Sequence, residues 1–91
     1  MSKNYILVRE CSDETGFTST HVIRTSLKDT LEGAFEKLES FIKICLEKYP
    51  GATVIRDGDR SAMVQFTKDA LYGNQVIKVH GRIIYKIEEL I

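Results

Sequence analysis

Residues 27–49 read LKDTLEGAFEKLESFIKICLEKY, and they hold the clearest secondary-structure signal in the chain. Their apolar residues recur three and four positions apart, which is the spacing of a core-facing helical stripe. Ser26 followed by Asp29 has the form of a capping box, and Pro50 with Gly51 ends the pattern. We therefore predict one amphipathic helix of about 22 residues. The stripe consists of Leu27, Leu31, Ala34, Phe35, Leu38, Phe41, Ile42, Cys45, Leu46 and Tyr49.

The segment before this helix predicts a hairpin. Tyr5 to Val8 is apolar at every position, which suits an interior strand covered on both faces. Residues 11–20 are polar and contain Gly16, so we expect a long loop there. Residues 20–25 are short and β-branched, and they predict the return strand.

Three further strands are expected after the helix. Residues 52–56 and 60–67 flank Asp57 and Gly58, a pair typical of a type I′ turn, and Gly73 with Asn74 marks a second turn. In residues 75–88 five apolar residues have odd numbers, and Gly81 shares their parity. They are Ile77, Val79, Ile83, Tyr85 and Ile87. One long strand that bends at Gly81 would keep them all on one face.

The predicted order is β-β-α-β-β-β, in a single α+β domain over residues 1–91. One amphipathic helix can cover one face of a sheet, so we expect a two-layer sandwich with an antiparallel sheet. The other face of that sheet is left open to solvent or to a partner.

Composition excludes several functional classes. The chain has 13 Lys plus Arg and 13 Asp plus Glu, and this zero net charge gives no overall attraction to nucleic acid or to an anionic membrane. No apolar run is long enough to span a bilayer, and the N-terminal residues have no signal-peptide pattern. We therefore expect a cytoplasmic protein with no membrane partner.

Candidate catalytic and metal-binding residues are few. Cys11 and His21 flank the first hairpin loop, where an imidazole would activate a thiol, but no third orienting group accompanies them. Asp57 and Asp59 are spaced to hold a hard cation, although aspartate is also the ordinary residue of such a turn. Cys11, Cys45 and the histidines lack zinc-site spacing, and a disulfide is not expected. We expect no catalytic residue, no metal and no cofactor.

The outward parity of the last strand supplies the candidate binding site. If its odd residues face the helix, its even residues form a basic stripe with an apolar position at Ile84. Met63 and Gln65 have the outward parity of the preceding strand. Apolar anchors inside a charged rim are typical of protein interfaces. The plain alternative is a solvated sheet face. The candidate site consists of Met63, Gln65, Lys78, His80, Arg82, Ile84 and Lys86.

These features favour a small non-catalytic intracellular binding module of the inhibitor or adaptor type, a class that phages and other mobile elements also encode. Its partner would be an acidic protein or a second copy of the chain, as a homodimer. One alternative is nucleic-acid binding through Lys78, His80, Arg82 and Lys86, although this face has no stacking aromatic residue. A further alternative is a small oligomeric enzyme with its site near Cys11 and His21.

Overall fold

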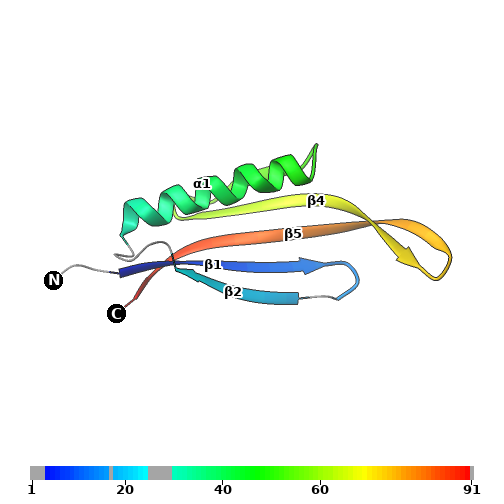
Figure 1. Cartoon of the computed structure of the whole chain (residues 1–91), viewed down its shortest axis with the longest axis horizontal. Coiled ribbons are helices and arrows are strands. Elements are labelled where there is room, and N and C mark those ends of the chain that lie inside the picture. The colour runs from blue at the N-terminus through cyan, green and yellow to red at the C-terminus, as the bar shows by residue number, and fades with distance from the viewer. Residues whose placement is uncertain (1–3, 17, 25–29, 91) are drawn as a thin grey trace.

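The computed structural model describes residues 4–16, 18–24 and 30–90, and it has the predicted β-β-α-β-β-β order (Figure 1). The five strands form one antiparallel sheet in the order β2-β1-β5-β4-β3. The helix lies along one face of this sheet, so the predicted α+β two-layer sandwich is confirmed. The elements are β1 (Asn4–Asp13), β2 (Thr18–Arg24), α1 (Leu31–Lys48), β3 (Thr53–Arg56), β4 (Ser61–Tyr72) and β5 (Gln75–Leu90).

The hydrophobic core lies between α1 and the sheet. Leu38 is 1% exposed, and it packs in one cluster with Leu7 of β1, Val64 of β4 and Tyr85 of β5. Every member of this cluster on β5 has an odd number, as the parity of residues 75–88 predicts. The same parity leaves the even residues of β5 on the face away from α1, which we call the open face.

The interior position of β1 is also confirmed. β1 lies between β2 and β5, and its three consecutive residues Ile6, Leu7 and Val8 are all buried. Burial at adjacent positions means that both faces of the strand are covered at this point. This is the pattern that the continuous apolar run predicts.

The helix begins later than predicted. Its N-cap is Thr30, whose hydroxyl accepts a hydrogen bond from the Gly33 amide at 3.0 Å, and α1 has 18 residues. Thr30 provides this cap because a threonine oxygen can satisfy an amide of the first turn. Leu27 and the expected cap residues Ser26 and Asp29 lie outside the described residues. The prediction that Leu46 belongs to the core-facing stripe is wrong, because Leu46 is 41% exposed.

Both hairpins before and after the helix differ in detail from the prediction. β1 and β2 stay paired as far as Ser12 and Thr18, so the long loop expected over residues 11–20 is wrong. The loop after β3 is not a two-residue turn either. Asp57 donates its amide to the Ser61 carbonyl at 3.0 Å, which leaves three residues between them, with Gly58 at a φ of 73°. The hairpins themselves are where the sequence places them.

Strands β4 and β5 extend together past the ends of their neighbours. β1 pairs with β5 only as far as Gly81, and β3 pairs with β4 only as far as Gln65, whereas β4 and β5 continue to the Tyr72–Gln75 pair. Among the described residues, 67–80 therefore form a two-stranded ribbon, which we call the arm (Figure 1). The arm lies at one end of a molecule that measures 56 × 22 × 21 Å.

Candidate binding surface on the open sheet face

All seven candidate residues lie on β4 and β5, and cross-strand pairing brings them together. Met63 is opposite Ile84, and Gln65 is opposite Arg82. Both apolar residues are half-buried, and the polar and charged members of the set are exposed. Parity therefore located a continuous surface on the open face. The remaining members are Lys78, His80 and Lys86, which follow the same face along β5.

Strand β1 supplies a second side of this surface, which the sequence reasoning missed. Glu10 is paired with Ile84, and Ser12 is paired with Arg82. Both are therefore on the open face beside the candidate residues. The pattern of a single strand does not say which strand lies next to it, so the sequence carried no signal for this neighbour.

Acids from other strands balance much of the expected basic stripe. The Lys78 ammonium lies 2.6 Å from the Asp69 carboxylate, on the neighbouring strand β4. The Lys86 ammonium lies 3.7 Å from the Glu10 carboxylate, on β1. Residues 75–87 contain no acid, so the open face looked more positive from sequence than it is in three dimensions.

The His80 position is held by the loop that follows β1. The Glu14 amide donates to the His80 carbonyl at 3.1 Å, and the His80 amide donates to a Glu14 carboxylate oxygen at 2.6 Å. The His80 ring nitrogen Nε2 is also 3.8 Å from that carboxylate. The first hairpin loop is thus attached to β5 at the base of the arm.

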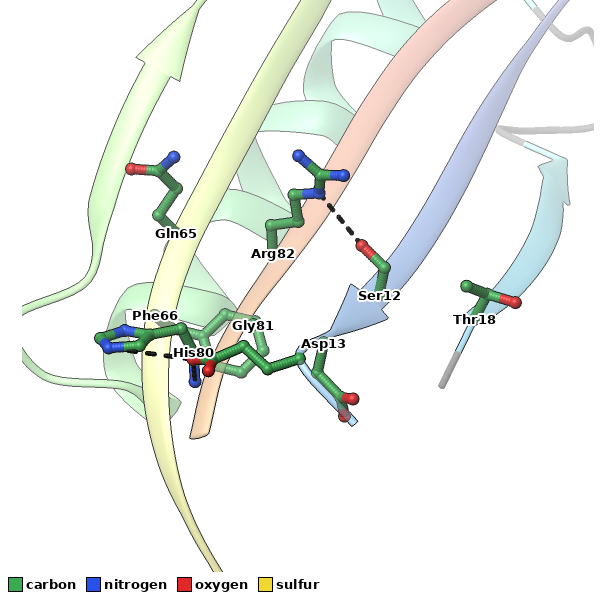
Figure 2. Close-up of a pocket in the computed structure, with 9 residues that line it drawn as sticks. Ser12, Asp13, Thr18, Gln65, Phe66, His80, Gly81 and Arg82 are labelled. Carbon is green, nitrogen blue, oxygen red and sulfur yellow. Dashed lines mark hydrogen bonds and ion pairs between the residues drawn. The ribbon is translucent and has the colours of Figure 1, made fainter. Parts of the chain in front are cut away.

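Arg82 differs from these bases. Its Nε donates to the Ser12 hydroxyl at 3.1 Å, and no carboxylate lies within ion-pair distance of it in the described part of the chain. Figure 2 shows the Arg82 side chain directed toward Ser12, with Gln65 and Thr18 on the flanking strands. These residues line a hollow of about 630 Å³. The hollow therefore offers a guanidinium together with hydroxyl and amide groups.

Asp13 closes one end of this hollow, and its carboxylate is well supported. It accepts hydrogen bonds from the hydroxyl and the amide of Thr15, and it forms an ion pair with Lys68 at 3.0 Å. The Thr15 hydroxyl and then Lys68 lower the pKa of Asp13 from 3.8 to about 2, because both stabilise the charged form. Asp13 thus ties the end of β1 to the base of the arm.

The proposed alternative site near Cys11 lies on the other face. Cys11 is paired with Ser19, and Arg9 is paired with His21, so Cys11 and His21 are diagonal neighbours on the face toward α1. Both cysteines are free thiols, and the Cys45 sulfur lies 3.2 Å from the Tyr85 hydroxyl inside the core. Burial, followed by this sulfur contact, raises the pKa of Tyr85.

Asp57 and Asp59 are exposed in the loop after β3, and no group of three or more His, Cys, Asp or Glu side chains in the part of the chain that the structure describes is arranged to hold a metal ion. Within the described residues, no helix is long and apolar enough to cross a membrane.

Comparison of the chain with protein-family models, with curated proteins and with solved structures gave no match.

Proposed function

We propose that this protein is a non-catalytic intracellular binding module that docks its open face on an acidic surface of another protein. The observation that carries the proposal is the environment of Arg82. Its guanidinium lies in a hollow beside the Ser12 hydroxyl, and among the described residues it has no carboxylate partner. A carboxylate of the partner would complete this group, since arginine binds carboxylates through paired hydrogen bonds.

The neighbouring residues support a protein as the partner. Met63 and Ile84 form a half-buried apolar pair next to the Gln65–Arg82 pair. An apolar anchor beside an arginine is the composition of an interface hot spot. Nucleic acid is less well supported as the partner, because phosphate groups are bound by basic side chains that have no acidic partner, whereas Lys78 is already paired with Asp69.

The test compares three single variants in affinity capture from the native host. Arg82→Glu removes the guanidinium, Ile84→Asp disrupts the apolar anchor, and Lys43→Glu makes the same charge change as the first on an exposed position of α1. The specific partner is a protein that the parent and Lys43→Glu retain and that Arg82→Glu and Ile84→Asp lose. Titration of that purified protein should then give slower association for Arg82→Glu and a weaker dependence on salt.

Several results would contradict the proposal. Capture that is equal for all variants would mean that the open face is a solvated surface. A parent that is dimeric by light scattering, with Ile84→Asp monomeric, would show self-association in place of a foreign partner. Nucleic acid as the captured species, bound with steep salt dependence, would favour the alternative class. Loss of the biological activity in a folded Cys11→Ser variant would favour an enzyme.

A further inference from the structure

A second cavity lies on the other side of the sheet, at the C-terminal end of α1. It has a volume of about 270 Å³, and residues of β1, β4, β5 and the end of the helix line it. One part of its wall is the stacked pair of Tyr49 and Phe66, whose ring centroids are 4.1 Å apart. The cavity is therefore bounded by strands and by the helix end, and it adjoins the hollow at Arg82, with which it shares Ser12, Asp13 and Phe66.

The charged groups around this cavity are mostly positive. Arg9, Lys48 and Lys68 are three cations, and Asp13 is one anion, which leaves an excess of two positive charges among the lining residues. Lys68 is the cation that Asp13 already neutralises, at 3.0 Å. Arg9 and Lys48 are thus the lining cations that no carboxylate of the described residues neutralises, although the Arg9 side chain also interacts with the Tyr85 hydroxyl. The helix end carries partial negative charge, and Lys48, in the last turn, offsets it.

Arg9 provides the strongest evidence. It is half-buried under α1, its guanidinium carbon is 5.7 Å from the centre of the Phe41 ring, and no carboxylate of the described residues pairs with it. Its Nε is the one buried side-chain nitrogen or oxygen without a hydrogen-bond partner in the part of the chain that the structure describes. A buried donor of a charged group is costly when it has no partner, so this nitrogen is expected to have one in the working protein.

We propose that this cavity binds a small phosphoryl oxyanion, as free phosphate or as the phosphate group of a small metabolite. A phosphate group carries about 1.5 to 2 negative charges at neutral pH, which matches the excess of two positive charges. Its oxygens would accept from Arg9 and Lys48. The stacked rings of Tyr49 and Phe66 form the apolar part of the wall beside these contacts.

The experiment follows the side-chain Nε–H resonance of Arg9 in the ¹⁵N-labelled protein during titration with inorganic phosphate. Sodium chloride at equal ionic strength is the reference, and a sugar phosphate is titrated separately. We expect a saturable shift of this resonance with phosphate that chloride does not produce. Saturation by inorganic phosphate alone would identify free phosphate as the ligand, and saturation by both would identify a phosphomonoester site.

Three variants make the test specific. Arg9→Gln should weaken phosphate binding at least about tenfold, because it removes the buried charged donor. Lys48→Gln should weaken it about two- to fivefold, since Lys48 is exposed and its loss should not affect folding. Lys37→Gln, on an exposed position of α1 away from the cavity lining, should leave binding unchanged.

The proposal would be overturned by an Arg9 resonance that does not respond to phosphate. It would equally be overturned if Lys37→Gln weakened binding as much as Lys48→Gln, because the effect would then be general screening. Should Arg9→Gln fail to fold, the comparison of Lys48→Gln with Lys37→Gln still decides whether phosphate binds in this cavity, because only Lys48→Gln should weaken binding. Arg9 and Lys48 do not line the hollow at Arg82, and Arg82 does not line this cavity, so this site and the proposed function fail independently.

Discussion

The ring of Phe66 lies against the bare backbone of Gly81, directly across strands β4 and β5. A Cβ atom at residue 81 would be only 2.6 Å from Cζ of that ring, so the ring occupies the space of the missing side chain. The same ring is stacked on Tyr49, with an angle of 18° between the planes. Phe66 thus connects the middle of β5 to the end of the helix, and it compensates for a glycine inside a strand.

The first prediction concerns this contact. Gly81→Ala should destabilise the protein by about 1–3 kcal/mol, because the new methyl group forces Phe66 out of place. Phe66→Leu in the same chain should recover part of the loss, which chemical denaturation of the two single variants and the double variant would measure. Additive losses in the double variant would mean that Gly81 is required for another reason.

The second prediction tests the register of α1. Leu38→Ala should lower the free energy of unfolding by about 2–5 kcal/mol, since Leu38 is buried in the core. Phe35→Ala should lower the free energy of unfolding by less than Leu38→Ala, because Phe35 is only partly buried against the core. Ile44→Ala is the matched control, since Ile44 is 52% exposed, and it should change stability by less than about 0.5 kcal/mol. A loss for Ile44→Ala as large as that for Leu38→Ala would refute the register.

A third prediction follows from the lowered pKa of Asp13. A carboxyl group whose folded pKa is about 2, against an ordinary 3.8, stabilises the protein above pH 3.8 and loses that contribution as the pH falls through 2. Asp13→Asn should therefore flatten the decline of stability over this interval, as measured by denaturation at a series of pH values. Lys68→Met should flatten it in part, because Lys68 is the second cause of the shift. An unchanged pH profile in Asp13→Asn would contradict the assignment.

The fourth prediction concerns the open face as a surface. Ile84 is half-buried and lies opposite Met63, away from α1. Ile84→Asp should therefore fold, with a loss of about 1 kcal/mol, well below that of Leu38→Ala. Circular dichroism and denaturation would measure this. An unfolded Ile84→Asp protein would mean that Ile84 is a core residue in solution.

Parity and periodicity predicted most of this fold from sequence. The odd-numbered residues of β5 face α1 because alternation in a strand is a local rule, and no other element is needed to read it. The helix start was harder, since residues 26–29 and Thr30 offer competing caps. The first loop was predicted too long because residues 10–12 pair with residues 18–20 across the hairpin, and the backbone pairing of polar residues does not show in composition.

Sequence parity predicted the face on which the candidate residues lie, and their role as a binding site stays a prediction. Parity placed Arg82 on the open face, yet its distinct chemistry depends on Ser12 and on the absence of a nearby acid. Those facts arise from strand order, which no single segment encodes. The cavity beside Arg9 was missed for the same reason, because its lining comes from β1, β4, β5 and the end of α1.

Strand β5 passes through two environments along its length. Residues 82–86 lie between β1 and β4, whereas residues 75–80 have β4 as their one neighbouring strand in the part of the chain that the structure describes. A two-stranded ribbon is only marginally stable in water, so the arm can open locally while the rest of the sheet stays closed. Amide hydrogen exchange should therefore be fast on one side of Gly81 and slow on the other. One continuous strand thus contains a cooperative unit and a segment that a partner can reshape without unfolding the core.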